Sequence, residues 1–161
     1  MTAAVVLPAA KDVRDMLSGL LGKPVAVNPG APVTPTPKSP VSVAVYVDPA
    51  MHVNALCVLD LGASAYTAGA LALLPPGGCQ DAVEEDGELS GLMAEALHEV
   101  VNVLSAVFNV PGAPHSKLHA LYVPGEDLPG DVAGMLAAFN RIDLAIEVTG
   151  YGKGGLSLVI P

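Results

Sequence analysis

The stretch Glu95-Ala96-Leu97-His98-Glu99-Val100-Val101-Asn102 lies within the longest helix that the sequence predicts, about 88–109. An α-helix turns by about 100° per residue, so side chains three or four positions apart share one face. The apolar residues with this spacing are Leu92, Met93, Leu97, Val100, Val101, Leu104, Val107 and Phe108. The residues of the opposite face are Glu95, Glu99, Asn102, Ala106 and Asn109. The segment therefore predicts an amphipathic helix with one face in a core and the other face turned outward.

The Glu-x-x-Asn pair of Glu99 and Asn102 has two interpretations when only its helix is considered. Polar residues at positions i and i+3 are common on helix surfaces, so the pair fits an ordinary solvated face. A carboxylate and a carboxamide that packing does not require are also free to bind a partner or to take part in a reaction. The periodicity alone leaves both interpretations open.

The composition is that of a folded globular chain. The 161 residues are 52% hydrophobic and 14% charged, which excludes a disordered chain and a coiled coil. This length fits one domain, so we expect a single domain over residues 1–161, with a Pro-rich loop at 35–40. The longest uncharged run, 61–80, is rich in Gly, Ala, Ser and Pro, so no membrane span is expected.

The charge and the cysteines narrow the class of protein further. Sixteen acidic and seven basic side chains give a net charge of −9, which repels a phosphate backbone, so no nucleic-acid partner is expected. Cys57 and Cys79 have no C-x-x-C spacing and no second pair, so neither a metal site nor a disulfide framework is predicted. Cys57 is interpreted as a buried, small apolar side chain. Residues 1–8 lack a basic region, so no signal peptide is predicted and a reducing cytoplasm fits best.

The chain alternates between helical and extended patterns. Apolar spacing predicts helices at 11–21, 88–109 and 131–139, and a small-residue helix that Asp60 or Ser64 caps and that ends near 74. Extended segments are predicted at 24–33, 41–47, 52–59 and 117–123, and a closing hairpin pairs 142–149 with 156–160. The acidic segment 81–88 is predicted to be a solvated connector. Hairpins mixed with helices predict an α+β fold in which helices cover one face of a largely antiparallel sheet.

Three other motifs are weaker candidates for a site. The glycine-rich segment 150–155 joins two predicted strands and lacks the Gly-Lys-Ser/Thr ending of a phosphate-binding loop, so it is interpreted as a turn. His115 and His119 are four residues apart, but Pro114 argues against a helix there and no acid or cysteine completes a metal site. Ser105 has no base near it in the sequence and is interpreted as an ordinary helix serine.

The order of these elements, together with Glu99-Val100-Val101-Asn102, resembles the CheX/CheC/FliY family of response-regulator phosphatases and is most similar to single-site CheX. The resemblance covers most of the chain. The opening helix that ends at Gly22-Lys23-Pro24, the hairpin of 41–59, the helix after Asp60 and the final hairpin occur in the family's order. The helix near 131 carries no second Glu-x-x-Asn, unlike two-site CheC. The fold that this implies is α+β, with helices packed on a largely antiparallel, CheX-like sheet.

The resemblance implies an enzyme, a hydrolase that removes phosphate from the aspartyl-phosphate of a CheY-like receiver domain. In this interpretation Asn102 orients the hydrolytic water and Glu99 contacts the cationic site of the receiver. Glu95 adds negative charge for docking, and Ala106 keeps the exposed ridge low enough for close approach. The protein is expected to hold no metal or cofactor of its own, since Mg²⁺ belongs to the receiver.

Two alternatives to catalysis remain open at this stage. One is a non-catalytic CheX-like adaptor that uses the same helix to bind a receiver or another signalling partner. The other is a purely structural homodimer, because the family resemblance implies a dimer and the composition permits a buried interface. The discriminating observation is whether a phosphorylated receiver loses its phosphate faster when this protein is present.

Overall fold

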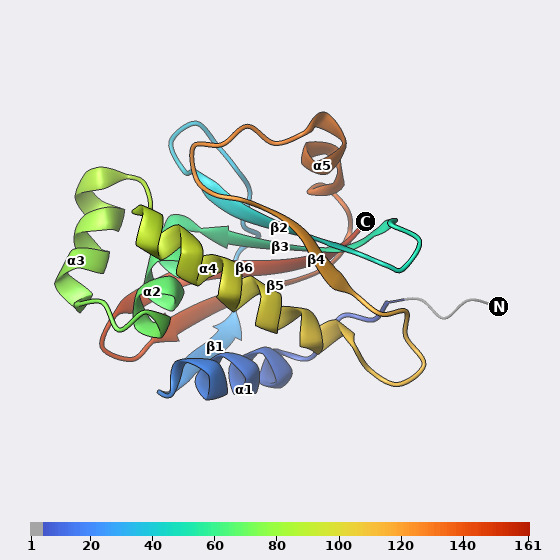
Figure 1. The fold of residues 1–161 in the computed structure, drawn as a ribbon, viewed down its shortest axis with the longest axis horizontal. Helices are drawn as coiled ribbons and strands as arrows, with labels where there is room; N and C mark the ends of the chain where they lie inside the picture. The colour runs from blue at the N-terminus through green and yellow to red at the C-terminus, as the bar shows by residue number, and fades with distance from the viewer. Residues whose placement is uncertain (1–4) are drawn as a thin grey trace.

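A computed structural model describes residues 5–161 of the chain; the start of the segment on which the signal-peptide prediction rests, residues 1–4, lies outside them. Its centre is a six-stranded sheet in which every neighbouring pair is antiparallel, in the order β1-β5-β6-β3-β2-β4 (Figure 1). The strands are β1 (Val25–Pro29), β2 (Val41–Val47), β3 (Val53–Asp60), β4 (Lys117–Tyr122), β5 (Asn140–Val148) and β6 (Gly152–Ile160). The predicted α+β class with an antiparallel sheet is confirmed.

The helices lie on both faces of this sheet. They are α1 (Ala10–Leu21), α2 (Leu61–Leu71), α3 (Pro76–Asp81), η1 (Ala82–Asp86), α4 (Gly91–Leu104), η2 (Ser105–Phe108) and α5 (Gly130–Met135). The apolar sides of α1, α2 and α4 form the larger core with one sheet face. Val132 of α5 and Leu136, which follows it, belong to a smaller core on the other face.

The burial of β2, which lies between β3 and β4, shows that both faces of the sheet are covered. All seven of its residues are buried, whereas a strand with one solvated face would alternate. Ala44 and Tyr46 point to the larger core, and Val43 and Val45 point to the smaller one. The prediction that helices cover one face is therefore wrong, because Val132 of α5 packs on the second face together with residues outside the helices, among them Val33 and Leu136.

The long helix is shorter and less regular than its periodicity predicts. Ser90 caps α4, its hydroxyl accepting the Met93 amide at 3.2 Å, so the helix does not begin near 88. After Leu104 the chain continues as a 3₁₀ segment to Phe108. Of the predicted apolar face, only Leu92 is exposed (53%). Leu92 stands in the first turn of α4, and the buried part of the helix begins at Met93.

Several other boundaries differ from the sequence-based expectations. The extended segment 24–33 forms a strand only at Val25–Pro29, and α2 ends at Leu71 rather than near 74. The Asp60 carboxylate caps α2 by accepting the Ala63 amide at 2.8 Å, whereas the Ser64 hydroxyl donates to the Asp60 carbonyl inside the helix. The acidic segment is not a plain connector, because Asp81 ends α3 and Ala82–Asp86 form a π-helical turn. The last helix stops at Met135.

The glycines between β5 and β6 have two different roles. Gly150 stands in the turn with φ +81°, a conformation that favours glycine. Gly154 lies inside β6, where a Cβ atom would be 2.1 Å from the backbone nitrogen of Ala63 in α2. The glycine therefore lets α2 pack directly on the sheet, and the predicted turn accounts for only part of this segment.

Within residues 5–161, one helical run, Gly91–Phe108, has the length and the mean hydropathy of a membrane span. It comprises α4 and η2. Leu97, Val101 and Leu104 on this run are fully buried against the sheet and the other helices. Packing in the core accounts for its hydropathy.

Candidate functional site

The outer face of α4 carries the predicted site residues as a ridge, defined here as Glu95, Glu99, Asn102 and Ala106. All four are exposed, and they follow one another at three- and four-residue spacing. In the part of the chain that the structure describes, no hydrogen bond or ion pair engages the side chains of Glu95, Glu99 or Asn102. Both carboxylates and the carboxamide of the ridge are therefore open to a partner.

Asn109, the fifth residue predicted for the exposed face, does not belong to the ridge. It is half-buried, and its side chain holds the loop that leads to β4. The Asn109 carbonyl oxygen accepts the Ser116 amide at 2.7 Å, and its amide group donates to the Ser116 carbonyl at 3.1 Å. The change from α-helix to 3₁₀ geometry at Ser105 alters the rotation per residue, which moves Asn109 off the outer face.

Two shallow grooves lie beside the ridge. The groove between α4–η2 and α1 has a volume of about 540 Å³ and contains Ala106, with Met16, Leu20 and Val110 among its apolar lining. The groove between α4 and the end of β4 has a volume of about 420 Å³, and its lining includes Glu95 and His98. Ala106, one turn after Asn102, contributes only a methyl group to the lining of the first groove.

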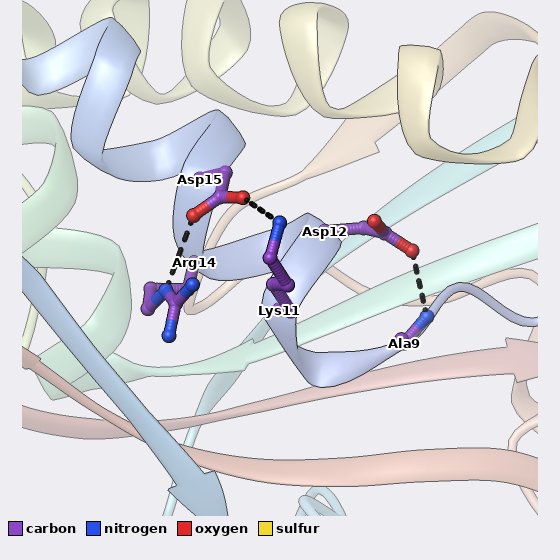
Figure 2. A network of polar contacts seen from close by, with 5 residues as sticks. All are labelled: Ala9, Lys11, Asp12, Arg14 and Asp15. Atoms are coloured by element: carbon purple, nitrogen blue, oxygen red, sulfur yellow. Dashed lines mark hydrogen bonds and ion pairs between the residues drawn. The ribbon is translucent and has the colours of Figure 1, made fainter.

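The charges on α1, across the first groove, are balanced among themselves (Figure 2). Asp15 pairs with Lys11 at 2.8 Å and with Arg14 at 3.1 Å, and Asp12 accepts the backbone amide of Ala9 at 3.0 Å. The hydrogen bonds from Lys11 and Arg14 lower the pKa of Asp15. Within residues 5–161 the carboxylates of Glu95 and Glu99 form no ion pair, so across this groove the unpaired negative charge lies on α4 and not on α1.

The backbone beneath Asn102 is held from both sides. The hydroxyl of Tyr46, a fully buried residue of β2, donates to the Val101 carbonyl at 2.6 Å. On the outer side, the Ser105 hydroxyl donates to the Asn102 carbonyl at 2.7 Å. Sequence reasoning placed Tyr46 in a strand and assigned it no role, because a contact across 55 residues leaves no local pattern.

The histidines and the cysteine considered in the sequence analysis do not form a second site. His115 lies in the loop before β4 and His119 lies within β4, both exposed, so they do not share a helix. Within residues 5–161 no three His, Cys, Asp or Glu side chains come together as a metal site would require. Cys57 is fully buried, as predicted, and burial raises the pKa of its thiol.

Comparison with solved structures gives the wider context of this geometry. The FliY structure from Thermotoga maritima superposes with a TM-score of 0.61 at 15% identity, covering 95% of this chain and 84% of that chain. FliM in the FliM–SpeE complex from H. pylori gives a TM-score of 0.61 at 13% identity, covering 94% and 81%. The CheX–CheY–BeF3–Mg²⁺ complex from Borrelia burgdorferi gives 0.55 at 14% identity, covering 92% of each chain. The chain has the CheX/FliY/FliM fold.

At this level of identity the likeness shows the fold and nothing finer. No family model matches the sequence, and no curated protein matches it either. The structural likeness confirms the CheX-like fold predicted from the order of elements. The CheX/FliY/FliM fold is described in complexes of different kinds: CheX with CheY, and FliM with SpeE or with FliG.

Proposed function

We propose that this protein binds a phosphorylated, CheY-like receiver domain and hydrolyses its aspartyl-phosphate. The observation that carries the proposal is the exposed Asn102 carboxamide, which has no partner within the described chain and stands one turn after the equally unpaired Glu99. A CheX of the same fold is described in complex with CheY, BeF3 and Mg²⁺, which supports a receiver as the partner.

The reaction needs little covalent chemistry from the protein. Water attacks phosphorus, the bond from phosphorus to the aspartyl oxygen breaks, and the products are a free aspartate carboxylate and inorganic phosphate. Because the acyl phosphate is already reactive, catalysis consists mainly of holding one water in line with the breaking bond. The ridge therefore does not have to supply a nucleophile.

Asn102 suits the placement of this water. A carboxamide donates and accepts hydrogen bonds, and it remains neutral beside a phosphoryl dianion. Its position on a helix whose backbone is anchored by Tyr46 and Ser105 favours a fixed direction of approach. Asn102 is therefore assigned the role of orienting the hydrolytic water.

Glu99 is assigned the docking contact. Its carboxylate is exposed and forms no ion pair with any residue of the described range 5–161, so it is available for a charge-assisted bond to the cationic site of the receiver. Mg²⁺ and the phosphoryl group are supplied by the receiver, and Glu95 adds negative charge one turn earlier. Ala106 lets the receiver approach, because its side chain ends at the methyl group.

The test follows phosphate release from a phosphorylated receiver. Asn102→Ala is expected to lower the rate of phosphate release by about a hundredfold or more, which is the contribution of positioning the attacking water. Receiver binding is expected to remain nearly unchanged. Glu99→Ala is expected to weaken binding by about tenfold, the loss of one charge-assisted contact. Asn28→Ala in β1 and Glu85→Ala in η1, both exposed, are the matched controls. Turnover that survives Asn102→Ala would reject the catalytic role.

A second candidate function is a non-catalytic adaptor. It is favoured by the FliM structures of the same fold, which are described in complexes with FliG and with SpeE. On this alternative the ridge still binds the receiver, but the half-life of the phosphorylated receiver does not shorten. Binding measured by titration, combined with an unchanged rate of phosphate loss, would select the adaptor over the phosphatase.

A further inference from the structure

The point where α4 changes its geometry lies directly after the proposed water-orienting residue. The amide of Ser105 bonds the carbonyl of Asn102, three residues back, where an α-helical bond would reach Val101. The Val101 carbonyl accepts the Tyr46 hydroxyl at 2.6 Å. A side chain of the central sheet therefore engages the helix at the residue before Asn102.

Tyr46 also contacts the 3₁₀ segment on the far side of this transition. Its ring lies 5.7 Å from the ring of Phe108, centroid to centroid, with an interplanar angle of 54°. Both rings are fully buried. Tyr46 thus joins the last turn of α4 and the end of η2 to β2, one through its hydroxyl and one through its ring.

The hydroxyl is a permanent donor. Burial raises the pKa of Tyr46 well above its usual range, so the group keeps its proton throughout the physiological range. Its bond to Val101 is therefore not lost by deprotonation of Tyr46 at physiological pH. On the solvent side, the Ser105 hydroxyl completes the arrangement by donating to the Asn102 carbonyl at 2.7 Å.

We infer that the Tyr46 hydroxyl is a positioning group for Asn102: it fixes the place where the helix tightens and thereby the direction in which the Asn102 carboxamide leaves the ridge. The inference rests on the proposed function, since a fixed direction matters because Asn102 holds the attacking water. A small displacement of the Asn102 carboxamide would lower turnover strongly, because the attacking water would move out of line, and it would leave the rest of the docking surface in place.

Tyr46→Phe removes the hydroxyl and keeps the ring against Phe108. It is expected to lower kcat for phosphate release by about tenfold while KM for the phosphorylated receiver changes by less than about twofold. The matched control is Tyr151→Phe, because the Tyr151 hydroxyl also donates to a carbonyl, that of Leu74, at 2.7 Å, in a contact between the segment after α2 and the β5–β6 turn. The control is expected to keep wild-type kcat.

A second variant and a second measurement make the test independent of folding and of activity. Ser105→Ala removes the other anchor at a half-exposed position and is expected to lower kcat in the same direction. NMR couplings that report χ1 of Asn102 in the free protein are expected to show one rotamer in wild type and Tyr151→Phe, and rotamer averaging in Tyr46→Phe. Unchanged turnover, or an unchanged Asn102 rotamer in Tyr46→Phe, overturns the inference. If the wild-type protein is itself inactive on receivers, the proposed function fails, and the rotamer measurement still decides whether Tyr46 fixes Asn102.

Discussion

The Asn102 carboxamide forms hydrogen bonds and carries no charge, whereas the carboxylate of its isostere aspartate forms hydrogen bonds but is negatively charged. Asn102→Asp keeps the shape of the side chain but replaces the amide donor by a second acceptor and adds a negative charge facing the phosphoryl group. Turnover is expected to fall by at least about a hundredfold, and receiver affinity is expected to fall as well, because like charges repel at this range.

The control for this substitution is Asn28→Asp, which makes the same change of net charge on an exposed residue of the edge strand β1. This control distinguishes the effect of a negative charge at position 102 from the effect of a more negative net charge. Phosphate release and receiver titration are measured on both variants. Equal losses in the two would show that overall charge, and not the position of Asn102, governs the reaction.

The residues of the ridge could be predicted because helical periodicity is a local property. The exposed positions of Glu95, Glu99 and Asn102 follow from spacing alone. Tyr46 could not be found in this way, since its contact with Val101 spans 55 residues and its strand pattern records only that it points inward. Asn109 does not lie on the exposed face as predicted, because no local sequence pattern indicates the change to 3₁₀ geometry at Ser105.

At the scale of elements, the packing of α2 on β6 depends on the absence of one methyl group. A Cβ atom on Gly154 would lie 2.1 Å from the backbone nitrogen of Ala63, and neither backbone can move without displacing the sheet or the helix. Gly154→Ala is therefore expected to lower the free energy of unfolding by about 1–3 kcal/mol or more, as overpacking does.

Gly19→Ala is the matched control for Gly154→Ala. Gly19 lies in α1 with nothing within 4 Å of the added carbon, so alanine there is expected to raise stability by about 0.5–1 kcal/mol. Urea unfolding of both variants measures the difference. A Gly154→Ala protein as stable as wild type would mean that α2 packs less closely on β6 than the structure shows.

For the whole molecule, the sequence predicts the class of the fold better than its layering. Alternation in β2 identifies a strand, but its two apolar faces are explained only by the two clusters that cover them, one with α1, α2 and α4 and the other with Val132 of α5. The order β1-β5-β6-β3-β2-β4 brings together strands that are far apart in the chain, which no local pattern records. The position of α5 follows from that order, and so the second covered face was not foreseen.

The net charge of −9 and the unpaired carboxylates of the ridge bear on how a receiver would approach. Attraction between Glu95, Glu99 and the cationic site of the receiver acts over about a Debye length, roughly 10 Å at 0.1 M salt. Raising the salt concentration from about 0.05 to about 0.5 M is therefore expected to slow association severalfold while kcat stays nearly constant, since screening acts on the encounter more than on close contacts.

Glu95→Gln removes one charge from the ridge. It is expected to reduce the salt dependence of the association rate without lowering kcat. Glu85→Gln removes the same charge from η1 and is expected to change this salt dependence less. Stopped-flow association at several salt concentrations measures both slopes. Parallel slopes for the two variants would mean that the receiver responds to the total charge of the protein and does not meet it along α4.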